Sequence, residues 1–558
     1  MINIRFLALA GWISAQAMAG VAFGQVLTHG PVVGGVTDSG ANIFVRTDQA
    51  ASVAIRYGTD PNFANYLTSD AFDTDSSSDF TKIIQLAGLT AETTYYLDVV
   101  VNDVPQLTAP YPSFRTFPPI GSSRDFTFLA LSDFTTVRTL TGPSQTFASA
   151  AAVNPVFAFI GGDFDHRNPH RLAEKRQMFK DLYDPNMPYM GDFVNLILRK
   201  MPIVHQWDDH DSGSNNIDRT YPDWSLTQQA FQEYIPSYAL PSVTPGIWQK
   251  LSYAQADLFV LDCRSQRDPE DDPDGPDKSM LDGNSLGATG QLQWLENGLL
   301  SSIARWKVIF TSVVTNPTTK FPDGWAGYDT EWNALKDFIN SNNIQGIVFI
   351  SGDLHIGAID NGTASGFPEM CVSQANGAGS CPTDRPGVWS EGFYQDKSCK
   401  GFNLVTVSTN PDRLTLQVLD ELGNTRITYT LGDGIPTPTP TPTPTPAPPV
   451  ITKQPKNKVA KLGQTAKFTV MATGTLPLSF QWQKNGADIP GATTPIYNTP
   501  PTTLDDNGAT FDVVVTNNVG TVTSTGALLI VRVRSASSSE PPDPVQPIRR
   551  TNSIAMAP

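Results

Sequence analysis

Residues 201–216, "MPIVHQWDDHDSGSNN", place a short apolar approach directly before a crowd of acidic side chains. Asp208, Asp209 and Asp211 surround His210 within four consecutive positions. Neighbouring carboxylates repel one another unless a cation or free solvation relieves the repulsion, and buried charges must be paired or bind metal. The stretch is therefore either a solvated acidic loop or one wall of a metal site.

The same arrangement of an apolar run followed by metal-capable residues recurs at three other places. Asp133 follows "FLAL", Asp163 and His166 follow "FAFIGG", and Asp353 and His355 follow "VFISG". These runs alternate with amphipathic segments such as "DTEWNALKDFINSN", which is the pattern of an α/β fold. Because ligands collect at the carboxyl ends of strands in such folds, the four strand ends together favour a metal site.

The length and charge of the chain set further bounds. A chain of 558 residues is too long for one hydrophobic core, so several domains are expected. The net charge of -16, from 54 acidic and 38 basic residues, argues against a surface that binds nucleic-acid polymers.

Residues 1–24 are expected to form a Sec-type signal peptide. They hold one Arg, then an uncharged apolar run, then the small residues Ala17 and Ala19, and the run is short and interrupted for a membrane span. No later segment approaches the ~18 unbroken apolar residues of a spanning helix. The sequence therefore predicts a secreted or periplasmic protein with no membrane span.

The chain has four cysteines, which permit one or two disulfides in an exported protein. Cys381 and Cys399 flank a stretch rich in Gly, Pro and Asp and are the preferred pair. Cys263 lies in an apolar strand-like run and is expected to be a free, buried thiol.

Residues 25–118, which precede the α/β region of residues 119–434, read as an all-β sandwich. Short β-type runs alternate there with Gly, Asp, Asn and Thr turns. Leu89, Thr93 and Tyr95 resemble a corner of fibronectin type III modules. We therefore expect a fibronectin III-like module before the α/β core.

A second all-β module follows the core. Residues 435–449 are a Pro-Thr repeat that favours an extended spacer, because Pro lacks the N–H donor of helices and central strands. Residues 450–532 resemble a bacterial immunoglobulin-like domain with Trp482 as its core tryptophan. Residues 533–558 have little to bury and are expected to be disordered.

The motifs "SD", "GGDFDH", "DDHD", "VLDCRSQR" and "SGDLH", in this order, resemble the dinuclear metallophosphatase superfamily and, within it, the PhoD-like alkaline phosphatases and phosphodiesterases. The resemblance covers nearly all of residues 125–431. It implies an α/β metallophosphatase core, a four-layer α/β/β/α sandwich, between the two all-β modules. It also implies an exported phosphoesterase that hydrolyses phosphomonoesters, phosphodiesters or both by attack of a metal-bridging hydroxide.

The resemblance further implies roles for individual side chains. Asp163 would bridge two metal ions, His210 would stabilise or protonate the leaving oxygen, and Arg264 would grip a phosphate oxygen. A structural ion pair of Arg264 with Asp262 or Asp209 is the alternative for that residue. The implied metal ligands are Asp133, Asp163, His166 and His355 for one ion, and Asp209 and Asp353, with the bridging Asp163, for the other.

Two departures from the family leave the identity of the metals open. PhoD-like members commonly carry Cys at the position of Asp133 and Tyr at the position of His166, and both of those ligands favour ferric iron. No histidine lies between His210 and His355, so the second ion would meet mostly oxygen donors, which suit Ca²⁺, Mg²⁺ or Mn²⁺ better than Zn²⁺. We expect two divalent or trivalent ions, with Fe, Ca, Mn and Zn as candidates.

Two other functions fit the same sequence. One is a phospholipase-type diesterase. The other is a surface adhesion or binding protein with a degenerate phosphatase scaffold, which the β modules and the Pro-Thr spacer favour and which the retained acids at all four strand ends oppose. The immunoglobulin-like domain is a candidate contact to a cell surface or a polysaccharide, and a monomer is expected.

Overall fold

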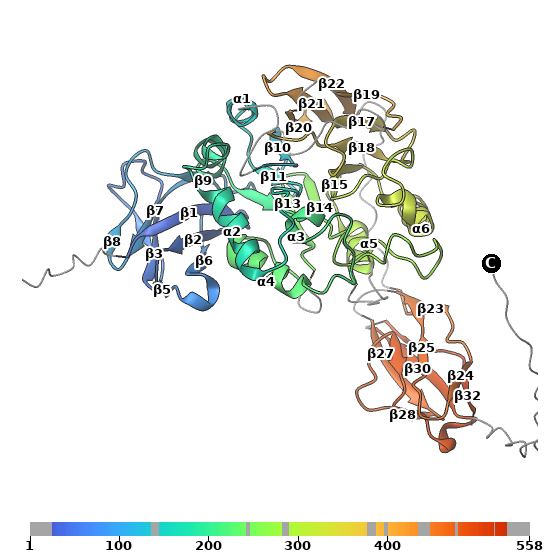
Figure 1. The fold of residues 1–558 in the computed structure, drawn as a ribbon. Coiled ribbons are helices and arrows are strands. Elements are labelled where there is room, and N and C mark those ends of the chain that lie inside the picture. Colours follow the sequence, from blue (N-terminus) through green and yellow to red (C-terminus); the bar gives the residue numbers. More distant parts are fainter. Residues whose placement is uncertain are drawn as a thin grey trace, which may run out of the picture. The chain divides into compact units, whose positions relative to one another are not determined.

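The computed structural model describes residues 25–135, 144–241, 246–281, 290–376, 387–394, 400–432, 447–474, 478–517 and 519–532 (Figure 1). The chain forms two compact units, Met1–Thr439 and Pro440–Pro558. The expected signal peptide and tail, most of the Pro-Thr spacer, and the preferred disulfide partners Cys381 and Cys399 lie outside the described residues. Among the described helices, none is both long and apolar enough to cross a membrane.

The first nine strands belong to two sheets. One is a six-stranded sheet in which β3 pairs with β7, and the other contains β1, β2 and β6. The amide of Thr90 donates a hydrogen bond of 3.0 Å to the hydroxyl of Tyr95, as in the tyrosine corners of β-sandwiches. The strands are β1 (Leu27–Gly34), β2 (Gly40–Thr47), β3 (Ser52–Gly58), β4 (Leu67–Thr68), β5 (Phe72–Asp73), β6 (Thr81–Ala87), β7 (Thr94–Val101), β8 (Val104–Pro105) and β9 (Ser113–Arg115), with a short 3₁₀ turn η1 (Ser76–Ser78) before β6.

A nine-stranded sheet joins these N-terminal strands to the α/β region, in the order β22-β21-β20-β10-β11-β12-β1-β2-β6. Strand β1 pairs in parallel with β12, where Gly34 lies opposite Ile203. The N-terminal strands therefore continue the sheet of the core, a connection that the alternation of the sequence does not reveal. The further strands are β10 (Phe126–Leu131), β11 (Ala158–Ile160), β12 (Ile203–His205), β20 (Gly401–Thr409), β21 (Asp412–Asp420) and β22 (Thr425–Leu431).

The second sheet of the core has seven strands in the order β13-β14-β15-β16-β18-β17-β19. Strands β14, β15, β16 and β18 run parallel. Every residue of β15 is buried, because parallel strands in such a core are covered on both faces. The strands are β13 (Gln249–Tyr253), β14 (Ala256–Val260), β15 (Trp306–Thr311), β16 (Ile347–Ser351), β17 (Gly357–Asn361), β18 (Pro368–Cys371) and β19 (Gly392–Tyr394).

Packing between the two sheets forms the largest hydrophobic core. The rings of Phe159 and Phe310, one from each sheet, stack with centroids 3.8 Å apart. Along β15, Val308 and Phe310 face this core, whereas the intervening Ile309 packs on the opposite side of the strand. The two core sheets therefore face each other through alternate residues of their strands.

Helices cover the outer faces of both sheets. On the nine-stranded sheet, α2 and α4 pack with the outward side chains of β10, β11 and β12, and on the seven-stranded sheet, α5 and α6 pack with those of β14, β15 and β16. The core is therefore of the α/β class. The helices are α1 (Thr146–Ala152), α2 (Leu172–Tyr183), α3 (Asp209–Ser212), α4 (Trp224–Tyr234), α5 (Gln291–Ser301) and α6 (Asp329–Ser341), with the π-helical segment η2 (Phe193–Leu198) and the 3₁₀ turn η4 (Trp325–Tyr328).

The second unit has the core of an immunoglobulin-like domain. Trp482 is fully buried, and its indole nitrogen donates to the carbonyl of Thr494 at 2.8 Å. The rings of Phe468 and Phe511 stack beside it with centroids 4.6 Å apart. Its elements are β23 (Val450–Lys453), β24 (Lys458–Lys461), β25 (Lys467–Thr469), β26 (Met471–Thr473), β27 (Ser479–Lys484), β28 (Ala487–Asp488), β29 (Ile496–Asn498), η5 (Leu504–Asp506), β30 (Thr510–Thr516), β31 (Thr521–Thr523) and β32 (Ala527–Arg532).

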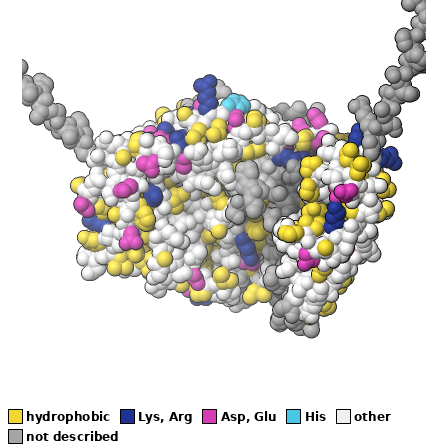
Figure 2. All heavy atoms as spheres, turned by 90° about the horizontal axis from the view of Figure 1, so that it is seen from below, with side chains coloured by type: hydrophobic (Ala, Val, Ile, Leu, Met, Phe, Trp, Pro, Cys, Tyr) yellow, Lys and Arg dark blue, Asp and Glu magenta, His cyan; other side chains and the backbone are white. Residues whose placement is uncertain are grey.

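Charged side chains of both signs are scattered over the face seen in Figure 2 rather than gathered into a basic patch. Cys263 is free and buried, as predicted from its strand-like surroundings, and Cys371 is also free and buried.

One buried histidine makes the stability of the core depend on pH. His205 ends β12 among the rings of Phe164, Phe179 and Phe231, and within the described part of the chain neither ring nitrogen has a hydrogen-bond partner. Burial lowers the pKa of His205 from 6.5 to about 3. The unfolded chain therefore takes up a proton on this side chain near pH 6.5, whereas the folded chain does not.

We expect this histidine to remove about 2 kcal/mol of stability between pH 8 and pH 5. Because the pKa of His205 is lowered in the folded state, its protonation favours the unfolded chain. The free energy of unfolding is therefore unaffected well above pH 6.5 and decreases as the pH falls below it. Urea unfolding at the two pH values should show a smaller loss for His205→Phe than for the unaltered protein. The exposed His170, changed to Gln, serves as the control. Equal losses in the His205 variant and the unaltered protein would contradict the prediction.

Candidate metal centre

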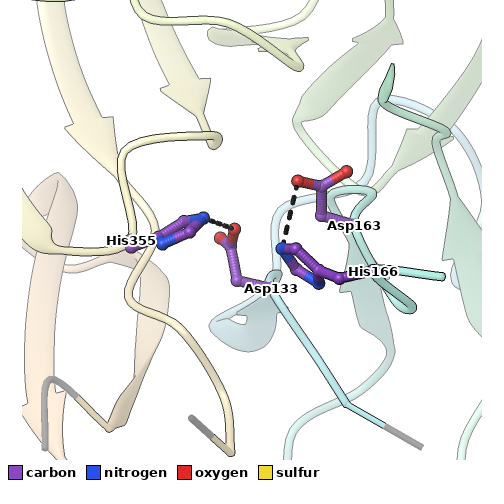
Figure 3. A group of neighbouring side chains, drawn as sticks. All are labelled: Asp133, Asp163, His166 and His355. Atoms are coloured by element: carbon purple, nitrogen blue, oxygen red, sulfur yellow. Dashed lines mark ion pairs between the residues drawn. The ribbon is translucent and has the colours of Figure 1, made fainter. Parts of the chain in front are cut away.

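The carboxyl ends of strands from both core sheets meet at one place. Asp133 follows β10 and Asp163 and His166 follow β11 in the nine-stranded sheet, while His355 follows β16 in the seven-stranded sheet. Figure 3 shows His355 facing Asp133 and His166 turned toward Asp163. The Nε2 atom of His355 lies 3.1 Å from Asp133 Oδ1, and the Nε2 atom of His166 lies 3.6 Å from Asp163 Oδ2.

Three overlapping groups of side chains here have the spacing of metal ligands, and one carboxylate belongs to all of them. Within each group, one ligand atom per residue lies within 4.8 Å of the others. Asp163 is the shared member, so the groups adjoin one another. The groups are Asp133, Asp163, His166 and His355; Asp163, Asp209 and His210; and Asp163, Asp208, Asp209 and Asp353. The structure thus brings together all six side chains that the sequence analysis names as metal ligands, and adds Asp208.

Sharp turns after the strands direct these side chains inward. Asp133, Asp163, Asp353 and His355 have φ angles of 54°, 51°, 65° and 60°, in the left-handed region that residues other than glycine rarely adopt. Such conformations cost about 1–3 kcal/mol each and gather at functional sites. Gly162, with φ of 91°, is required because a Cβ atom there would lie 2.7 Å from the amide nitrogen of Asp208.

The cluster is largely buried, and several of its ligand atoms lack a hydrogen-bond partner among the described residues. Oδ2 of Asp163, Oδ2 of Asp353 and both ring nitrogens of His166 have no hydrogen-bond partner among the described residues. Burial and the charges of Asp209 and Asp208 raise the pKa of Asp163 well above its usual value. Burial lowers the pKa of His166 to about 4, so its imidazole is neutral near pH 7, the form that binds metal. The donor set therefore fits bound cations.

Asp208 and Asp211, the other acidic residues of residues 201–216, make different contacts. The carboxylate of Asp211 accepts hydrogen bonds from the amides of Asp163, Phe164 and Asp208 at 2.8, 2.9 and 3.0 Å. It thereby holds the loop after β11 against the start of α3. Asp208 belongs to the group of four carboxylates with Asp163, Asp209 and Asp353, and it also pairs with Arg264.

Arg264 lies beneath the carboxylates and has no exposed surface. Its guanidinium pairs with Asp208 and with Asp323, the latter at 2.6 Å. Its Nη2 atom also lies 3.5 Å from Asp209 and 3.4 Å from Asp353.

Of the two ion-pair partners considered from the sequence, Asp209 is therefore a minor one. Asp262 instead accepts from the indole of Trp207 at 3.0 Å and from Ser265 Oγ at 2.6 Å. The buried setting supports a structural role for Arg264 rather than contact with a substrate.

Sequence reasoning missed three side chains of the site. Asp323 pairs with Arg264 and Arg267, the Nζ atom of Lys320 lies 2.8 Å from Oδ1 of Asp353, and Asn168 Oδ1 lies 2.5 Å from His210 Nδ1. Asp323 and Lys320 belong to "TTKFPDGW", which follows β15. Strand β15 runs parallel to β16 in the seven-stranded sheet. Polar residues after β15 are therefore also expected at the edge of the sheet where ligands bind.

Three family descriptions match parts of the sequence. Residues 161–373 match the PhoD-like phosphatase family, and residues 24–119 match a domain of unknown function, DUF7800. Residues 449–530 match the immunoglobulin I-set domain.

Similar proteins agree with these matches. Alkaline phosphatase D of Bacillus subtilis (strain 168) is 30% identical over an alignment of 182 residues, and the match covers 28% of this chain and 31% of the relative. The chain thus spans about a third of the length of that curated relative. The solved structure of PhoD matches with a TM-score of 0.57 at 18% identity and covers 74% of this chain and 92% of its own, which shows a shared fold. Residues 161–373 are therefore a PhoD-like phosphatase domain, in a chain that also carries an immunoglobulin I-set domain.

Proposed function

We propose that this protein is an exported, metal-dependent phosphoesterase. The observation that carries the proposal is the buried cluster in which adjoining groups of metal-capable side chains share Asp163. The PhoD-like domain and the shared fold support it. The facing sheets with helices outside them support a four-layer α/β/β/α arrangement of residues 119–434, and the composition of residues 1–24 supports export.

The cluster suits two ions of different preference. Asp133, Asp163, His166 and His355 would hold one ion with mixed nitrogen and oxygen donors, which suits Fe, Mn or Zn. The group of Asp163, Asp208, Asp209 and Asp353 offers only oxygen, which suits Ca²⁺ or Mn²⁺. When bound, such ions would lower the pKa of a water molecule and offset negative charge on the phosphoryl oxygens.

His210 would act on the leaving oxygen, and its contact with Asn168 supports this role. Its Nδ1 atom lies 2.5 Å from Asn168 Oδ1, and this oxygen only accepts, so the contact favours the tautomer with a hydrogen on Nδ1. That contact leaves Nε2 as the nitrogen that can hold or deliver a proton. Asn168 would thus orient His210 so that Nε2 serves the departing group.

The alternatives are less well supported. A degenerate scaffold, as an adhesion protein would carry, has no need for four non-glycine residues in the left-handed region around buried ligand atoms that have no hydrogen-bond partner among the described residues. A phospholipase-type diesterase would use the same site on another ester. We further propose that the protein is a monomer and that the immunoglobulin domain contacts a cell surface or polysaccharide.

Metal removal and reconstitution test the proposal directly. Full-length protein stripped by chelation should lose hydrolysis of p-nitrophenyl phosphate and bis(p-nitrophenyl) phosphate. Returning Ca²⁺, Mn²⁺, Fe or Zn²⁺, singly and in pairs, should restore turnover, raise the Tm and leave about two ions per chain. A folded protein that binds none of these ions and cleaves neither ester would refute the assignment.

A further inference from the structure

Lys320 is a positively charged side chain at the metal-capable cluster that is partly exposed to solvent. Of the positively charged side chains described there, Arg264 and Arg267 are fully buried, whereas the side chain of Lys320 is 29% exposed. Its Nζ atom lies 2.8 Å from Asp353 Oδ1 and 3.9 Å from Asp323 Oδ2. A charged group that is anchored to the cluster and still open to solvent is suited to contact a substrate.

The backbone at Lys320 is shaped to hold it there. Its φ angle of 54° lies in the left-handed region, which an unbranched, non-glycine side chain adopts only at a cost of about 1–3 kcal/mol. The amide of Gly324 donates to the carbonyl of Lys320 at 2.7 Å and closes the turn that follows. The loop after β15 thus directs Lys320 to the cluster.

Lys320 and a metal ion need not compete for Asp353. Oδ1 of Asp353 is the oxygen that Lys320 contacts, while Oδ2 is buried, accepts no hydrogen bond from the described residues and lies 3.4 Å from Nη2 of Arg264. Asp353 can therefore offer one oxygen to an ion and keep the other on Lys320.

We propose that Lys320 binds the phosphate group of the substrate and gives the site a preference for phosphomonoester dianions over phosphodiesters. The proposal rests on the phosphoesterase function proposed above. A monoester carries close to two negative charges above its second pKa of about 6, whereas a diester carries one. A lysine ammonium is a flexible point charge with three donors, so its attraction grows with the charge of the ligand.

A purely structural role for Lys320 predicts a different result. If Lys320 only neutralised Asp353 and Asp323, its removal would disturb the cluster whichever ester was bound. Both esters would then lose turnover to a similar extent. The ratio of the two kcat/KM values therefore separates the two roles.

The experiment uses full-length, metal-loaded protein at a pH above about 7, where the monoester is a dianion. In Lys320→Met, kcat/KM for p-nitrophenyl phosphate should fall about tenfold, and that for bis(p-nitrophenyl) phosphate at most about twofold. Affinity for inorganic phosphate, measured by calorimetry, should fall about tenfold as well, which is a readout independent of turnover. Lys320→Arg, which keeps the charge, should retain most of the preference.

Lys200→Met is the matched control for the loss of a surface charge. Lys200 is exposed and precedes β12, at the end of the strand away from the cluster, so both kcat/KM values should stay unchanged. Should Lys320→Met fail to fold, Lys320→Gln, which is one atom shorter than Lys but keeps a hydrogen-bond donor, replaces it. If the ratio of the two kcat/KM values is unchanged in a folded variant, the proposed role of Lys320 is overturned, but the phosphoesterase function is not. If the unaltered protein cleaves neither ester, the proposed function fails, and this inference with it.

Discussion

Replacement of Asp163 by asparagine is expected to abolish phosphate-ester hydrolysis, with a fall in kcat of about a thousandfold or more. Asp163 is the one residue common to all three groups of metal-capable side chains, so its loss weakens every one of them. Asparagine keeps the size of the side chain but removes the negative charge. The effect should therefore come from lost metal binding rather than from a cavity.

Stability measurements separate this cause from general damage. In metal-free protein, burial and the charges of Asp209 and Asp208 oppose ionisation of Asp163. Metal-free Asp163→Asn should accordingly be no less stable than the metal-free parent, and it should lose the rise in Tm that metal produces. Asp165→Asn, in the same loop but outside the metal-capable groups, should keep that rise. A variant of Asp163 with intact metal content and full turnover would show that the site has been assigned wrongly.

Replacement of Arg264 by methionine should destabilise the protein by about 3–5 kcal/mol. The guanidinium is fully buried and pairs with Asp208 and Asp323, so its removal leaves buried Asp208 without its main partner and leaves Asp323 paired with Arg267. Urea unfolding of metal-free protein measures the loss. The double variant Arg264→Met/Asp208→Asn should recover part of the lost stability, because the unpaired charge of Asp208 is removed.

The same variant distinguishes the two roles considered for Arg264. A residue that gripped the phosphate would leave the unfolding free energy almost unchanged and raise KM instead. Arg171→Met provides the comparison, since Arg171 is 84% exposed and its pair with Glu174 is long, at 4.0 Å. Its stability should change by less than about 0.5 kcal/mol. A similarly small loss in Arg264→Met would restore the substrate-binding role.

Local sequence was enough to identify the metal-capable side chains. Strands of parallel sheets are short apolar runs, and their carboxyl ends lie at one edge, so acids and histidines that follow such runs converge. This rule assigns Asp133, Asp163, His166, Asp353 and His355 to one set, and the structure places them together. These side chains converge because their strands are buried and run in the same direction. Both properties can be inferred from the order of apolar and polar residues along the chain.

Tertiary structure alone decided which cations serve the cluster and how the sheets are joined. Arg264 and Lys320 both follow apolar strands in sequence. Arg264 contacts Asp208 and Asp323, 56 and 59 positions away, and is fully buried. Lys320 contacts Asp353, 33 positions away, and its side chain is 29% exposed. The pairing of β1 with β12 likewise joins strands that lie far apart along the chain. The periodicity of apolar residues indicates which face of a helix or strand is buried. The burial of Arg264, the exposure of Lys320 and the pairing of β1 with β12 depend instead on which distant element packs against that face.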